Sequence, residues 1–177
     1  GAWTHGEAPN ALGDASGGGR FKACTLHDKA NRLRLRGDSE QARTVAQSAL
    51  ALSHSFADRI TATFGELTLG EIELAAGRTL LAGELCRRSL AVALATGHHR
   101  MHVRSLVALS EVDRVLGQLA AGRNRLADAL RACAQPGIIP SVHLVAVTLA
   151  QGHLACAEHD WTRARQLYTE TLATKGC

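Results

Sequence analysis

Aromatic residues and prolines are scarce in this chain of 177 residues. Phenylalanine, tryptophan and tyrosine together make up 3% of it, and only three prolines occur. β-Sheets concentrate aromatic and β-branched residues, whereas alanine and leucine, which dominate this sequence, are strong helix formers. Few prolines also leave room for long helices. The composition therefore predicts an all-α protein, long enough for one domain with a sizeable core.

The sequence also lacks a dense run of charge, a long apolar run and closely spaced cysteine pairs. Its net charge is +4, without the Lys/Arg run that is typical of a nucleic-acid-binding tail. No apolar run approaches the roughly 20 residues that a membrane span requires. The five cysteines show no C-x-x-C spacing. We expect a cytoplasmic protein with reduced thiols, no cofactor and no membrane partner.

A repeated pattern of small residues is the main positive signal. Glycines recur at a step of 40 residues, each followed five residues later by another small residue, and seven further on by a small residue and a leucine. A fourth copy lies 42 residues further along, with His159-Asp160 in place of the glycine. The matching positions are Gly37, Ala42, Ala49, Leu50; Gly77, Ala82, Ser89, Leu90; Gly117, Gly122, Ala129, Leu130; and Ala164, Thr171, Leu172. Seven residues before the turns stand Ala30, Gly70, Ser110 and Gly152.

Each copy predicts two helices joined by a turn. Glycine accepts the left-handed conformation that ends many helices, and small residues allow two helices to cross closely. A phosphate-binding loop at Gly70 and Gly77 is not indicated, because neither G-x-G-x-x-G nor G-K-[ST] occurs there. We expect a flexible Gly-rich lead-in or linker at residues 1–20 and a helical domain at 21–177, with units at about 21–56, 57–98, 99–138 and 139–177.

The pattern resembles the tetratricopeptide repeat family over roughly residues 21–174. It is carried by Leu69, Gly70, Gly77, Ala82, Ser89 and Leu90, by Leu109, Gly117, Gly122, Ala129 and Leu130, and by Gly152, Ala164, Tyr168 and Leu172. The usual period is about 34 residues, so the helices here are longer. That longer form is similar to the helical arrays of kinesin light chains, bacterial signalling ATPases and transcription regulators. The resemblance implies a right-handed α-α superhelix of four helical hairpins, serving as the sensor or scaffold of a bacterial regulator.

In this family the first helices of the hairpins line a concave groove that binds a peptide or a partner domain. Carried over to this sequence, the groove residues are His27, Asn31, Arg34, Phe64, Glu71, Arg104, Glu111, Arg114 and His153. The resemblance therefore implies binding without catalysis, with charge pairs orienting the ligand. An alternative is a domain that senses a small effector, with a deep apolar pocket around Phe64, Leu67 and Val107.

Two chemical alternatives are weaker. His98 and His102 stand four residues apart, so on one helix they would share a face and could hold a metal with a third ligand such as His54 or His143. Cys156 with His153 is the best thiol–histidine pair, but no orienting third group is visible. Cys133 could be an exposed thiol in the turn "RACAQPG", and Cys86 is more simply a core residue. We expect no metal site and no enzyme.

The remaining predictions concern the outer surface of the second helices and the exposed side of the last helix. Arginines at positions 87, 88, 123, 125 and 131 would face outward, but acidic residues interrupt them, which is typical of a solvated surface. The last helix keeps Leu167 and Leu172, which a further unit would cover. We therefore expect a fragment of a longer chain, or self-association through this helix.

Overall fold

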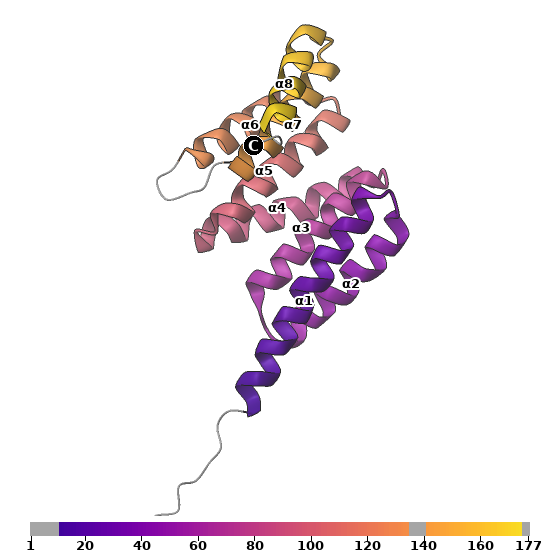
Figure 1. The fold of residues 1–177 in the computed structure, drawn as a ribbon, viewed down its shortest axis with the longest axis vertical. Helices are drawn as coiled ribbons and strands as arrows, with labels where there is room; N and C mark the ends of the chain where they lie inside the picture. The colour runs from indigo at the N-terminus through magenta and orange to yellow at the C-terminus, as the bar shows by residue number, and fades with distance from the viewer. Residues whose placement is uncertain (1–10, 135–140, 175–177) are drawn as a thin grey trace, which may run out of the picture. The chain divides into compact units, whose positions relative to one another are not determined.

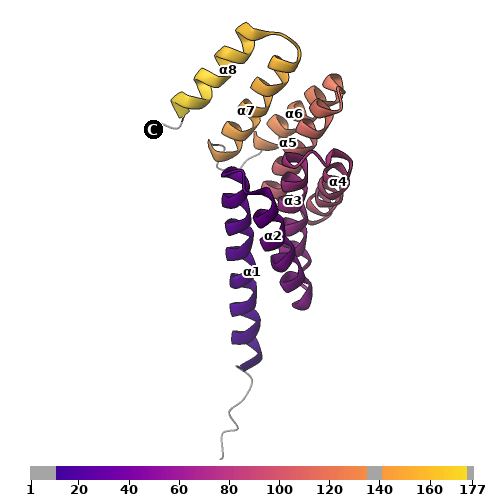
Figure 2. The same ribbon diagram turned by 90° about the vertical axis from the view of Figure 1, so that its right-hand side faces the viewer.

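The structure, a computed structural model, describes residues 11–134 and 141–174. Within these ranges it contains eight α-helices and no strand, so the all-α prediction is confirmed there (Figure 1). Their bounds are α1 Ala11–Leu35, α2 Ser39–Ser55, α3 Arg59–Ala75, α4 Thr79–Thr96, α5 His99–Val115, α6 Leu119–Cys133, α7 Ser141–Ala157 and α8 Trp161–Thr174. Consecutive helices pack as hairpins, as α7 and α8 show in Figure 2. The right-handed sense of the superhelix stays a prediction.

The helices end at the predicted turns. Gly37, Gly77 and Gly117 have φ angles of 88°, 78° and 74°, which glycine adopts without the clash that a Cβ would cause. In the hairpin turn at Gly77, the amide of Arg78 donates to the carbonyl of Glu73, which pairs a carbonyl that the helix leaves unbonded. His159, predicted to replace the glycine in the fourth copy, also has a left-handed φ of 61°.

The small residues lie where two helices cross, as predicted. A Cβ on Gly70 of α3 would stand 2.9 Å from Cys86 Sγ and 3.3 Å from the carbonyl oxygen of Ala82, both on α4. In the next hairpin a Cβ on Gly122 would stand 3.3 Å from the carbonyl oxygen of Ser110. The sequence therefore contains small residues because the helix backbones approach too closely for larger ones.

The chain divides into two compact units, Gly1–Gly65 and Glu66–Cys177, with the boundary inside α3. The domain bounds expected at 21–177 stay a prediction. The first unit packs α1 on α2 through a core of alanines, among them Ala30, Ala42 and Ala46, all fully buried. The second unit has a larger apolar core between α5, α6 and α7, formed by Val103, Leu106, Leu126, Ala129, Ala132, Cys133, Val147, Ala150 and Leu154.

The predicted lead-in differs at residues 11–20, because α1 begins at Ala11. A helix through this glycine-rich stretch costs about 1 kcal/mol per glycine relative to alanine. Packing compensates at Gly19, where a Cβ would stand 2.0 Å from Phe56 of the α2–α3 turn. The ring of Phe56 therefore takes the space that a side chain would fill. Residues 1–10 lie outside the described part.

None of the described helices combines the length and the apolar character that crossing a membrane requires.

Candidate functional site

The predicted groove residues lie in both units, and the first unit gives them different environments. His27 is buried, 5% exposed, with its ring packed against Gly65, where a Cβ would stand 2.4 Å from the ring. The side chain of His27 is thus enclosed in this structure, whereas the prediction placed it in an open groove. Arg34 donates from Nε and Nη2 to Asn31 Oδ1 at 3.1 and 2.9 Å. Phe64 is half-buried.

In the second unit the predicted residues share one side of α3, α5 and α7. We define this first-helix face by Thr68, Glu71, Arg104, Glu111, Arg114 and His153. On α5 the three members are 7 and 3 residues apart, a spacing that keeps them on one side of a helix. The face is half-buried except at Thr68, which is 1% exposed.

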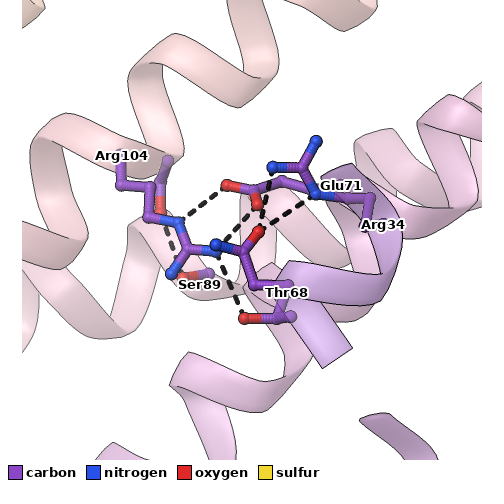
Figure 3. A network of polar contacts seen from close by, with 7 residues as sticks. Arg34, Thr68, Glu71, Ser89 and Arg104 are labelled. Carbon is purple, nitrogen blue, oxygen red and sulfur yellow. Dashed lines mark hydrogen bonds and ion pairs between the residues drawn. The ribbon is translucent and has the colours of Figure 1, made fainter. Parts of the chain in front are cut away.

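A bidentate ion pair joins α3 and α5 on this face. Arg104 Nε and Nη2 donate to the two carboxylate oxygens of Glu71, each at 2.7 Å, and Nη2 also donates to Thr68 Oγ1 at 3.3 Å (Figure 3). Beneath it, Ser105 Oγ donates to Ser89 Oγ at 3.0 Å, both fully buried. The planar guanidinium matches the carboxylate geometry, so both side chains are held in one orientation.

A second network joins α5 and α7. Glu111 Oε2 accepts from Arg114 Nε and Glu111 Oε1 pairs with His153 Nδ1, each at 2.9 Å. Burial raises the pKa of Glu111, but the hydrogen bond and charge of His153 and the charge of Arg114 outweigh it, so the pKa lies below its ordinary value. Glu111 therefore remains a carboxylate and orients the imidazole. Within the described residues, the terminal nitrogens of Arg114 and Nε2 of His153 make no hydrogen bond.

The network continues towards α8. The ring of Tyr168 lies 6.1 Å from that of His153, and its hydroxyl lies 3.5 Å from Cys156 Sγ. Burial, followed by the contact with Cys156, raises the pKa of Tyr168 to about 12. The orienting group that the sequence did not reveal for His153 is thus Glu111. The polar contact of Cys156, however, is with Tyr168, so a thiol–histidine pair is not formed by these contacts.

The histidines proposed as metal ligands are arranged differently from the prediction. His98 is the N-cap residue of α5, outside the helix, and its Nδ1 accepts from the amide of Met101 at 3.3 Å. Its Nδ1 is therefore engaged at the end of the helix rather than available to a metal. Within residues 11–134 and 141–174, no three His, Cys, Asp or Glu side chains gather as a metal site would need.

Two other cysteines are buried, and most of the arginines expected to face outward form ion pairs. Cys133 is 3% exposed, so the expected exposed thiol is wrong. Burial, with the charge of Glu71, raises the pKa of Cys86 to about 12. Of the five arginines expected to face outward, four pair with acidic groups: Arg88 with Glu66 and Glu84, Arg123 with Glu158, Arg125 with Asp113, and Arg131 with Asp128.

Sequence reasoning missed the pairings themselves, although a signal for one of them was present. Glu71 and Glu111 are one 40-residue step apart, and Glu111 and His153 are one 42-residue step apart. Equivalent positions on neighbouring repeats face each other when the units stack, which would have predicted the Glu111–His153 contact. No such signal pointed to Tyr168 or to the ion pair of buried Asp113 with half-buried Arg125, whose oxygen and nitrogen are 2.6 Å apart.

Comparison with known proteins gives no match, either to a protein-family model or to a curated protein. The fold and the site thus define only a structural class, an all-α protein of stacked helical hairpins with charged side chains along its first helices.

Proposed function

We propose that this protein is a protein-interaction module that binds a peptide or a partner domain on the first-helix face. The observation that supports this most is the pre-oriented polar row of the second unit. Arg114 and His153 are held by Glu111 while their remaining nitrogens point away from it, 32% and 40% exposed as side chains. Such fixed groups bind a ligand at a low cost in side-chain entropy. The terminal N–H groups of Arg114 donate hydrogen bonds, and His153 Nε2 accepts one when Nδ1–H donates to Glu111.

The ion pair Glu71–Arg104 extends the same row by one helix, so a ligand would meet both charge signs in a fixed order. An ordered pattern of charge favours one orientation of a ligand over its reverse. An extended or helical segment that crosses α3, α5 and α7 suits this arrangement. The small-effector alternative is less well supported, because Leu67 of its expected pocket is fully buried in the core.

The proposal includes the setting that the repeat resemblance implies. As the sensor or scaffold part of a bacterial regulator, the module would pass on the binding of a partner without chemistry of its own. A reducing, cytoplasmic setting agrees with the four described cysteines, Cys24, Cys86, Cys133 and Cys156, all of which are free thiols.

A displayed library of random peptides tests the proposal. Peptides selected on the full chain are measured for affinity against an Arg104→Gln/Arg114→Gln variant, which removes two charges from the face. The matched control is Arg88→Gln/Arg131→Gln, which removes two carboxylate-paired arginines from second helices. We expect the first variant to bind at least about tenfold more weakly and the control to bind like the parent.

Circular dichroism and urea unfolding establish that both variants are folded before affinities are compared. The proposal fails if the library enriches no peptide, or if the selected peptides bind the Arg104→Gln/Arg114→Gln variant as tightly as the parent.

A further inference from the structure

A pocket lies on the side of α7 away from His153 and belongs to none of the sites above. Its volume is about 180 Å³, and it lies between α6, α7 and the start of α8. The lining residues are Arg123, Leu126, Ala127 and Leu130 of α6, Gln151, Leu154, Ala155 and Glu158 at α7, and Arg163 of α8. On α6 and at α7 these residues follow the i, i+3, i+4, i+7 spacing of a single helix face. His153 points to nearly the opposite side of α7, so the pocket is separate from the first-helix face.

The pocket has an apolar floor and a charged rim. Leu126, Leu154 and Ala155 form the floor and belong to the buried core, each less than 5% exposed. On the rim, Arg123 Nε pairs with Glu158 Oε1 at 2.8 Å. The guanidinium of Arg163 is exposed and forms no hydrogen bond or ion pair among the described residues. Two cations and one carboxylate leave the rim with one unmatched positive charge.

The volume limits what the pocket can hold. It is smaller than the roughly 300–1,000 Å³ of a typical small-molecule site. An apolar cavity of about 150 Å³ accepts one benzene molecule, so this pocket has room for one phenyl or leucyl side chain. Such side chains, seated in well-packed pockets beside arginine, are the groups that contribute most of the affinity at protein interfaces.

We propose that this pocket docks an acidic segment of a partner protein, with one phenylalanine or leucine side chain on the apolar floor and a neighbouring carboxylate paired with Arg163. Charge complementarity selects an acidic segment, because the unmatched rim charge is positive and the chain carries a net charge of +4. The site does not depend on the first-helix face, so the two proposals can fail separately.

Fluorescence anisotropy with a defined probe tests the pocket. The probe is a fluorescein-labelled peptide of glutamates and glycines with one central phenylalanine, and a second probe has alanine in its place. The variants are Ala127→Phe, which fills the pocket, and Arg163→Glu, which reverses the free charge. Arg165→Glu is the matched control, since it reverses an exposed charge on the same helix outside the pocket.

We expect the phenylalanine probe to bind the parent and the Arg165→Glu variant with affinities within about threefold, and each pocket variant at least about tenfold more weakly. The alanine probe should also bind at least about tenfold more weakly than the phenylalanine probe. Arg114→Gln on the first-helix face should leave the affinity unchanged.

Four outcomes would overturn the proposal. The first would be that the parent does not bind the phenylalanine probe at about 1 mM, and the second that it binds both probes equally, because charge attraction alone would then explain the binding. The third would be that the pocket variants bind the probe like the parent. The fourth would be a dimer of the parent in sedimentation that Arg163→Glu dissociates, because a second copy of this chain would then be the occupant.

Discussion

At the scale of single residues, the turns show both what the sequence revealed and what it concealed. The glycines at 37, 77 and 117 were recognisable because they recur in register and glycine is the usual residue at a left-handed helix end. Ala57 has a φ of 51° without any such signal. An alanine in this left-handed conformation costs about 1–2 kcal/mol in backbone strain.

We predict opposite effects of one methyl group at two turns. Gly77→Ala should lower the free energy of unfolding by about 1 kcal/mol, because a Cβ at a φ of 78° is strained although it meets no atom within 4 Å. Ala57→Gly should raise it by about 0.5–1 kcal/mol, since relief of strain exceeds the greater freedom of glycine in the unfolded chain. Urea unfolding followed by circular dichroism measures both.

Gly18→Ala serves as the reference substitution, because Gly18 lies within α1 and a Cβ there meets open space. Helix propensity alone should make it stabilising by about 0.5–1 kcal/mol. If Gly77→Ala were also stabilising, backbone strain would not be the reason for glycine in the turn.

At the scale of helices, the repeat pattern predicted the crossings better than the site. Small residues at Gly70 and Gly122 could be recognised because close backbone approach leaves few alternatives. The groove residues were predicted from their position in the repeat. That position places a residue along a helix, but it does not decide whether the side chain is buried. His27 therefore lies in the core, while Glu71 and Arg104 lie on the face but bind each other.

We predict that Gly70→Ala lowers the free energy of unfolding by about 1–2 kcal/mol. Alanine gains about 1 kcal/mol in helix propensity, but its Cβ would stand 2.9 Å from Cys86 Sγ and 3.2 Å from Leu85 Cβ, and overpacking of this kind typically costs about 1–3 kcal/mol. The overpacking cost should be at the upper end of its range, because the backbone carbonyl of Ala82 is also close and cannot rotate away.

A double-mutant cycle identifies the cause. Cys86→Ala removes the sulfur nearest to the new methyl group, so Gly70→Ala/Cys86→Ala should be less destabilised than the sum of the two single variants. Strict additivity would mean that the sulfur does not limit the approach of α3 and α4.

At the scale of the whole molecule, the chain forms two compact units. The four copies are similar in pattern but not in content. The hairpin of α1 and α2 packs mainly through alanines, whereas α5, α6 and α7 share a core with leucines and valines. Pattern reasoning weighs the copies equally, while buried apolar area decides which of them form one compact body.

The free energy of unfolding should fall in two stages as the whole protein is acidified. Burial, with the charge of His99 at His102 and of Arg100 at His143, lowers the pKa of both histidines from the ordinary value of 6.5. The unfolded chain then binds more protons than the folded one, so stability is lost as pH falls through about 6.5. At Glu111, burial raises the pKa, but the hydrogen bonds and charges of His153 and Arg114 lower it by more, so the pKa lies below the ordinary value of 4.5. The stability that Glu111 contributes is therefore present above pH 4.5 and is lost as the pH falls below that value.

Urea unfolding at a series of pH values from about 7.5 to 3.5 measures this profile. His102→Gln/His143→Gln should flatten the first stage and leave the second, whereas Glu111→Gln should reduce the second stage alone. His54→Gln, at an exposed position of α2, is the control and should change neither. A profile that stays level between pH 7 and 5.5 in the parent would show that the two half-buried histidines are protonated as readily in the folded protein as in the unfolded chain. The second stage would then be left to report on the carboxylates, and its reduction by Glu111→Gln would still measure how strongly Arg114 and His153 hold that carboxylate on the first-helix face.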